Sequence, residues 1–217
     1  MAISRRVAAV LVVASAAMLA TGCTRVIHDA KVVAAPDMGK AGADASACTP
    51  VDAPLTKIPP QNDEEPILKI PQPQGWQRVT MMDSELIRFT MRNAGLATDS
   101  FAPTAVVTLE SVAGQHDPQE VFDSQHAALE SGAGATDINV TPATLCDLPA
   151  ETVTYTTPTI GPIPPHPAKV LCAVLQTDER TFAATLTLQS ADASNPDYQK
   201  EADMIFSGFQ MLPPTPN

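Results

Sequence analysis

The chain has 217 residues and a formal net charge of −11. A chain this acidic lacks the basic footprint of a general nucleic-acid binder, so we expect no nucleic-acid partner. Hydrophobic residues make up 44% of the sequence, which is enough for a packed core and excludes a chain that is disordered throughout.

The first 22 residues resemble a bacterial export signal. Arg5 and Arg6 form its charged start, and the apolar stretch that follows is too short for a permanent membrane span of roughly 20 residues. It ends at Leu19-Ala20-Thr21-Gly22-Cys23, which resembles the site where bacterial lipoproteins are cut before a diacylated Cys. We expect cleavage after Gly22 and lipidation of Cys23. The alternative is an ordinary secretory signal beside an unmodified Cys.

A lipid on Cys23 would hold the protein on the outer face of the cell membrane. No later apolar stretch has the length to span a membrane, so we expect a protein that is anchored rather than inserted. Residues 24–65 are rich in small residues and prolines and have no sustained period, which is typical of a flexible spacer. We therefore divide the chain into a signal peptide (1–22), a lipidated Cys with a tether (23–65), a globular domain (66–212) and a tail (213–217).

The globular domain shows a β-rich pattern interrupted by two helices. Two helix starts are predicted from an N-cap followed by Pro, at Asp117-Pro118 and at Asn195-Pro196. Residues 170–175 are apolar on both faces, which predicts a central strand covered on both sides. This order predicts an α+β fold, an antiparallel sheet with helices packed on it. The strands are expected at residues 67–70, 85–92, 104–112, 139–145, 150–157, 168–177 and 181–189.

The order of several short motifs is similar to that of LpqN/LpqT-type lipoproteins of actinobacterial cell envelopes. The resemblance covers roughly residues 66–212 and implies a Mog1/PsbP-like layered sandwich, whose better-known relatives are binding or accessory proteins. It supplies no catalytic residues. The motifs are the signal ending at Cys23, the Pro-rich spacer, Ile70-Pro71-Gln72-Pro73-Gln74-Gly75-Trp76, Asp117-Pro118, Leu148-Pro149-Ala150 and Gly208-Phe209-Gln210.

Trp76, the only Trp of the chain, lies in the turn that closes the first strand of the domain. We expect its side chain to be at least half buried and to anchor this turn against the helical layer.

Two features depart from the usual pattern of the LpqN/LpqT-type proteins. They are the three cysteines after Cys23 and the Pro-rich residues 158–167.

The sequence lacks the signatures of common catalytic and metal sites. It contains no HExxH, G-x-S-x-G, S-x-x-K, Walker A or GxGxxG motif, and its histidines have no metal-ligand spacing. Cys172 lies in the apolar strand without a local base, so we interpret it as a small buried hydrophobic residue rather than a nucleophile. We expect no enzymatic activity, no cofactor and no metal.

The cysteines allow one internal disulfide, because three remain after Cys23 and export permits oxidation. In a meander, Cys146 and Cys172 would lie two strand steps apart, about 9.5 Å, which is too far for a bond. We favour Cys48–Cys146, which would pin the tether to the sheet edge. Cys146–Cys172 and the absence of any bridge remain the alternatives.

Residues 158–167 hold five prolines in ten positions and join two predicted strands by a stiff extended loop. Ile160 and Ile163 are its large apolar residues and the candidate contacts with a partner. The alternative is a rigid connection without a partner.

Together these features predict a non-enzymatic, membrane-anchored envelope lipoprotein. It would bind a protein partner or an apolar, lipid-like envelope molecule. A large apolar cavity between helix and sheet would favour the lipid-like ligand, and a filled core would oppose it. The alternatives are a structural or surface-antigen lipoprotein without a specific ligand and an unrecognised envelope enzyme. The oligomeric state stays open.

Overall fold

The computed structural model describes residues 45–215. The predicted signal peptide, the cleavage site at Gly22, the lipidation site at Cys23 and the tether up to residue 44 lie outside the described residues. None of the described helices is long and apolar enough to cross a membrane.

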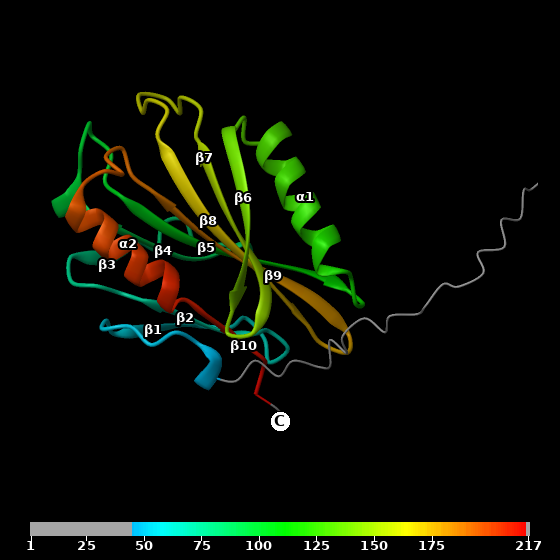
Figure 1. Cartoon of the computed structure of the whole chain (residues 1–217). Helices are drawn as coiled ribbons and strands as arrows, with labels where there is room; N and C mark the ends of the chain where they lie inside the picture. Colours follow the sequence, from blue (N-terminus) through cyan, green and yellow to red (C-terminus); the bar gives the residue numbers. More distant parts are fainter. Residues whose placement is uncertain (1–44, 216–217) are drawn as a thin grey trace, which may run out of the picture. The chain divides into compact units, whose positions relative to one another are not determined.

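Within the described part, two antiparallel sheets and two α-helices form a layered structure (Figure 1). The small sheet has the order β1-β2-β10 and the large sheet the order β3-β4-β5-β9-β8-β7-β6. The strands are β1 (Leu55–Ile58), β2 (Ile67–Pro71), β3 (Trp76–Arg78), β4 (Ile87–Asn93), β5 (Thr104–Ala113), β6 (Thr136–Leu145), β7 (Leu148–Thr156), β8 (Pro167–Gln176), β9 (Arg180–Gln189) and β10 (Gln210–Leu212). The helices are η1 (Ala45–Ala47), η2 (Ala94–Leu96), α1 (Pro118–Ser131) and α2 (Pro196–Gly208).

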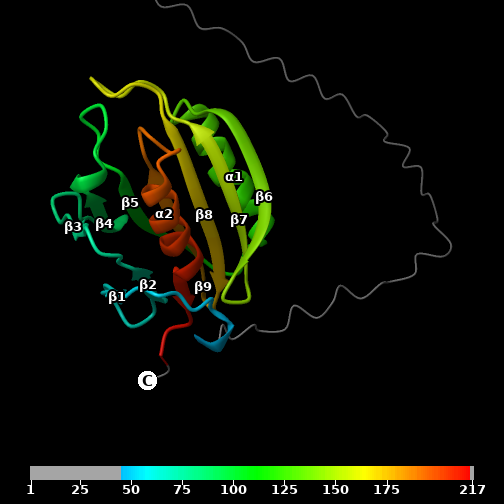
Figure 2. The same cartoon turned by 60° about the vertical axis from the view of Figure 1, so that its left-hand side comes forward.

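The two α-helices cover opposite faces of the large sheet (Figures 1 and 2). On one face, Phe122 of α1 packs against alternate residues of β8. On the other face, α2 and the small sheet enclose the main core, to which they contribute Ile205 and Ile70. The predicted α+β fold, an antiparallel sheet with helices packed on it, is therefore confirmed.

Strand β8 confirms the prediction of a central strand covered on both sides. Its residues from Val170 to Leu175 are all buried. Cys172 and Val174 face α1, while Leu171 and Ala173 belong to the main core beneath α2. Both faces of the strand are apolar because each is covered by a helix layer.

Both helices begin at the predicted N-caps. Asp117 accepts a hydrogen bond from the backbone N–H of Gln119, and Asn195 accepts hydrogen bonds from those of Asp197 and Tyr198. A Pro follows each cap at the first turn, where its missing N–H costs no helical hydrogen bond. The cap at Asn195 thereby fixes the position of Tyr198 at the start of α2.

The ordered domain begins before Pro66, which corrects the expected boundary of the tether. Strand β1 pairs with β2, from Leu55 opposite Pro71 to Ile58 opposite Leu68. Cys48 is buried as well. Short segments with one or two core contacts show no hydrophobic period of their own, and the partners that bury them lie far along the chain.

A buried ion pair fastens the connection between β1 and β2 to the large sheet. The Arg88 guanidinium donates to both carboxylate oxygens of Glu65, at 2.9 and 2.7 Å, and to the carbonyl of Pro59 at 3.2 Å. Burial favours a higher pKa for Glu65, but the hydrogen bonds from Arg88 and Gln61 and the charge of Arg88 outweigh it. The pKa of Glu65 therefore lies below its ordinary value of 4.5.

We expect Glu65→Gln to remove part of the acid sensitivity of the fold. A carboxylate with a lowered folded-state pKa contributes stability above its unfolded-state pKa of about 4.5, and this stability is lost as the pH falls through the folded-state pKa. The variant should have a lower free energy of unfolding than the wild type at pH 7. This difference between the two proteins should become smaller towards pH 3. Urea unfolding at both values measures this, with exposed Glu64→Gln as the control. A stability difference that does not change with pH would contradict a lowered pKa of Glu65.

Candidate functional site

An open groove of about 470 Å³ lies between α2 and the strands β7 and β8. We call it the α2 groove. One wall is formed by α2 and the segment before it, the other by the ends of β7 and β8. Its lining mixes apolar and polar side chains, among them Thr154, Thr156, Lys169, Ala193, Tyr198 and Gln199.

Tyr198 is the most unusual residue of this groove. Its side chain is buried, with 7% exposure, and burial together with the charge of Asp203 raises its pKa to about 12. The phenol is therefore neutral and can donate a hydrogen bond. Within residues 45–215 its hydroxyl has no protein hydrogen-bond partner, and its oxygen is not among the buried polar atoms left without one, so it opens to solvent in the groove. The groove thus offers a hydrogen-bond donor to a bound molecule.

Lys169 supplies the positive charge of the groove. Its Nζ lies 4.2 Å from the centre of the Phe206 ring and 3.8 Å from Oδ1 of Asp203. Asp203 is largely exposed, so this ion pair is a weak surface contact. The ammonium can exchange Asp203 for an acceptor on a bound molecule. The groove therefore offers both hydrogen-bond donors and acceptors.

The Pro-rich hairpin between β7 and β8 rises from one end of the groove, because Thr156 and Pro167 line the groove and also pair at its base. The base is held by His166, which is 3% exposed. Its Nδ1 lies 3.1 Å from Oγ1 of Thr157, and its Nε2 lies 3.3 Å from Oε1 of Gln189. Its ring also contacts the ring of Phe101, with centroids 4.6 Å apart.

The tip of this hairpin corrects the expectation of an extended loop. Ile160 and Ile163 exchange two backbone hydrogen bonds, of 2.9 and 3.0 Å, around Gly161 and Pro162. Gly161 has a φ of 58°, which glycine adopts without strain. The prolines therefore stiffen a closed turn. Ile160 is 53% exposed at its tip and Ile163 is half-buried.

The disulfide of the structure joins Cys48 to Cys146, the pairing that the sequence favoured. Cys172 is unbonded and 2% exposed, and burial raises the pKa of its thiol to about 12. A thiol this buried and this weakly acidic is a poor nucleophile. Its place between β7 and β9 agrees with its interpretation as a small core residue.

Trp76 confirms the prediction of a buried anchor. It is 3% exposed, and its indole N–H donates to Oε2 of Glu201 in α2 at 2.7 Å. Glu201 also accepts from Nδ2 of Asn93 at 3.0 Å, so one carboxylate ties both β3 and β4 to the helix.

A second groove, of about 360 Å³, lies between α1 and the strands β5 and β9. Glu110 and Glu120 give it an acidic rim, and Val112 and Val121 contribute apolar surface. Neither groove is an enclosed cavity. No cluster of three potential metal ligands occurs among residues 45–215.

Most of the α2 groove could not be predicted from the sequence. Its side chains come from β7, β8 and α2, which are separated in sequence and meet only in the folded sheet. Tyr198 belongs to the buried side of α2 together with Ala202 and Ile205, which explains its burial. No sequence signal showed that its hydroxyl would open into a groove.

Comparison with known proteins gives a fold and no closer relationship. Neither a family model nor a curated protein sequence matches the chain. The crystal structure of LpqN, described as involved in cell envelope biogenesis of Mycobacterium tuberculosis, is 17% identical with a TM-score of 0.58 and covers 74% of this chain and 91% of LpqN.

Two further structures match at lower TM-scores. The cyanobacterial PsbP of Synechocystis is 15% identical, with a TM-score of 0.48, covering 74% of this chain and 94% of that one. The yeast Ran-binding protein Mog1p of Saccharomyces cerevisiae is 9% identical, with a TM-score of 0.45, covering 75% of this chain and 97% of that one. The large sheet between α1 on one face and α2 with the small sheet on the other, together with the match to LpqN, identifies the fold of this chain as Mog1/PsbP-like.

Proposed function

We propose that this chain is an LpqN/LpqT-type lipoprotein, anchored on the outer face of the cell membrane through Cys23, that binds a protein of the cell envelope in its α2 groove. The lipoprotein-like signal supports the anchor. The shared fold with LpqN, a protein described as involved in cell envelope biogenesis, supports the envelope setting. The proposal assigns no catalytic step to the chain.

The observation that carries the binding function is the unpartnered hydroxyl of Tyr198 in an open groove. The hydroxyl reaches solvent through the open groove, so a molecule that seats an acceptor on it gains a hydrogen bond at a site largely shielded from water. The groove is open and mixed in polarity, whereas a carrier of wholly apolar lipid needs an enclosed apolar cavity. A peptide segment, with alternating polar and apolar groups, therefore fits better than a lipid chain.

The anchor is tested with Cys23→Ala. We expect the wild type to partition into detergent and to carry diacylglycerol, because two acyl chains bind a membrane surface stably. The variant should stay uncut or leave the membrane. Phase partition and intact mass measure both forms. Identical partition of the two forms, with no lipid mass on the wild type, would end the lipoprotein assignment.

The groove is tested with Tyr198→Phe and Thr154→Trp. Tyr198→Phe removes only a hydroxyl without a partner, so stability should change by less than about 0.5 kcal/mol, while binding of the envelope partner weakens. Thr154→Trp places a large ring in the groove from an exposed strand position and should block binding. Cross-linking in intact envelopes, followed by mass spectrometry, measures the bound protein.

The matched control is Thr141→Trp, the same change at an exposed position of β6 outside the groove lining. Ile160→Ser distinguishes binding at the hairpin tip from binding in the groove. It removes exposed apolar surface from the tip and leaves the groove lining unchanged. Equal cross-linking in the wild type, Tyr198→Phe and Thr154→Trp would contradict binding in the α2 groove. Loss with Ile160→Ser alone would move the contact to the hairpin.

A further inference from the structure

The loop between β3 and β4, residues 79–86, exposes three large apolar side chains within six residues. Met81 is 95% exposed, Met82 49% and Leu86 46%. Single exposed apolar residues are ordinary, but a local group of them marks a contact surface. Methionine is common at such surfaces, because its flexible side chain adapts to irregular neighbours.

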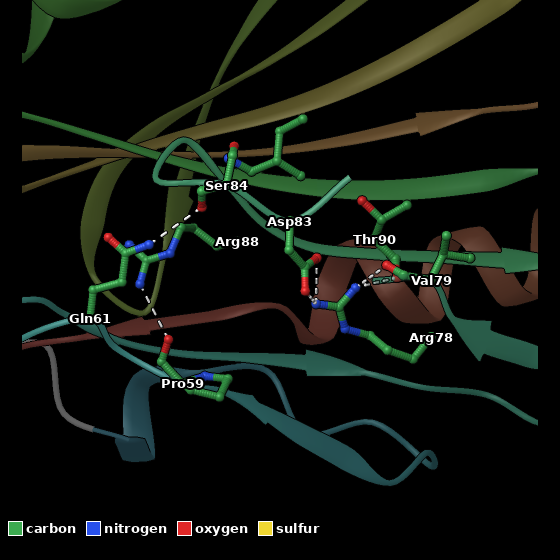
Figure 3. A network of polar contacts seen from close by, with 9 residues as sticks. Pro59, Gln61, Arg78, Val79, Asp83, Ser84, Arg88 and Thr90 are labelled. Carbon is green, nitrogen blue, oxygen red and sulfur yellow. Dashed lines mark hydrogen bonds and ion pairs between the residues drawn. The ribbon is translucent and has the colours of Figure 1, made fainter. Parts of the chain in front are cut away.

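This loop is held in place by Arg78 (Figure 3). One guanidinium nitrogen, Nη2, lies 2.7 Å from both carboxylate oxygens of Asp83, and Nη1 donates to the carbonyls of Val79 and Thr90. The guanidinium also stacks over the ring of Phe89, with Cζ 4.4 Å from its centroid. Arg78 thus ties the start and the middle of the loop to β4.

A second set of contacts supports the far side of the loop. The hydroxyl of Ser84 accepts from the backbone N–H of Ile87 at 2.9 Å, and the carbonyl of Ser84 accepts from Nε2 of Gln61 at 3.3 Å. Figure 3 shows Gln61 and Pro59 beneath this part of the loop. The methionines are therefore presented by a braced loop, which lowers the entropy lost when they make a contact.

The register of the large sheet puts this loop at the end that carries the disulfide. The loop leads into β4 at Ile87, which pairs with Thr108, and β5 continues in that direction to Ala113, opposite Arg180. The turn between β6 and β7, which holds Cys146, lies at the same end. Cys48 is bonded there, while the Pro-rich hairpin lies at the opposite end (Figure 1).

The distance from the anchor to the domain leaves the orientation of the domain undecided. Ala45 lies 22 positions after Cys23, and a chain of that length reaches at most roughly 75 Å. Such a reach allows either end of the sheet to approach the bilayer. A second contact is needed to choose between the ends, and the exposed methionines lie at the end where the chain enters.

We propose that Met81 and Met82 insert into the interfacial layer of the bilayer to which Cys23 is anchored. The inference rests on the proposed lipid anchor. The domain then stands with the β3–β4 loop on the membrane and the Pro-rich hairpin directed away from it. Exposed Glu85 adds negative charge to the loop itself, so the surface it fits is a zwitterionic one rather than a strongly anionic one.

The experiment places a fluorescent label on the loop of the full acylated protein. Met81→Cys is labelled with the environment-sensitive dye NBD, and Ile160→Cys at the opposite end is the matched exposed control. Cys172 is buried and Cys48–Cys146 is bonded, so the new thiol is the reactive one. The protein is reconstituted in phosphatidylcholine vesicles with and without nitroxide-bearing lipids, which quench the dye only inside the bilayer.

We expect at least a twofold loss of NBD emission at position 81 and none at position 160. Met82→Asp should reduce the quenching at position 81, and so should phosphatidylglycerol in the vesicles. Vesicle-bound protein without quenching at position 81 would overturn the inference and leave the anchor standing. Protein that does not bind vesicles would overturn the anchor and the inference together. A blue shift that rises with protein concentration but shows no quenching would assign the loop to a second copy of the chain and overturn the membrane contact.

Discussion

Replacing Cys48 and Cys146 together by Ala should lower the free energy of unfolding by about 2–5 kcal/mol. The bond joins residues 98 positions apart, so it removes many conformations from the unfolded chain. It also holds the segment before β1, which has few other core contacts, against the turn between β6 and β7. Urea unfolding of the double variant and of the wild type with and without reductant measures the effect.

The matched control for the disulfide is Cys172→Ala. Cys172 is as buried as the two bonded cysteines but carries no bond, so its replacement tests only the loss of a small core side chain. Reductant should destabilise the wild type and the control alike and leave the double variant unchanged. A wild type whose unfolding midpoint ignores reductant would show that the bond contributes no stability.

The elements that sequence predicted best are those whose signals are local. Asp117-Pro118 and Asn195-Pro196 define helix starts through groups within three residues of the cap. The strand from Val170 to Leu175 shows its double burial directly, because every position is apolar. Such signals can be recognised in a short stretch of sequence, because neighbouring residues supply both the pattern and the hydrogen bonds that it requires.

The features that sequence did not predict depend on distant partners. Strand β1 exists because its backbone pairs with β2, and only Ile58 of its four residues is buried, so they show no hydrophobic period. The α2 groove exists because α2 leaves the ends of β7 and β8 uncovered. The closed tip of the Pro-rich hairpin depends on the left-handed φ of Gly161. The five prolines favoured an extended loop, so the sequence did not predict this turn.

The two ends of the sheet have different surfaces. At one end are the disulfide and the β3–β4 loop with its exposed methionines. Towards the other are the Pro-rich hairpin and the α2 groove beside it. If the first end faces the bilayer, the groove and Ile160 are directed towards the rest of the envelope. The proposed membrane contact and the proposed partner site therefore do not compete for one surface.

Trp76→Ala should cost about 3–5 kcal/mol, the range for truncating a buried aromatic side chain. The indole is 3% exposed within the main core. Its loss leaves a cavity and removes one of the two hydrogen bonds that hold the Glu201 carboxylate. Because Glu201 links β3 and β4 to α2, we expect the helix to loosen along with the turn. Thermal and urea unfolding measure the cost.

Trp76→Phe separates packing from hydrogen bonding at this position. The smaller ring keeps most of the apolar contact but donates nothing to Glu201, so its cost should lie well below that of Trp76→Ala. If Phe costs as much as Ala, the link to Glu201 dominates, and Glu201→Gln should reproduce much of the loss. If Trp76→Ala leaves the unfolding midpoint unchanged, the indole is not an anchor in solution. The α2 groove, which shares the same helix, should then keep its binding in that variant. A fully packed Trp76 predicts the opposite. A loosened α2 then moves Tyr198 away from the β7 and β8 wall and weakens binding, although no residue that lines the groove is substituted.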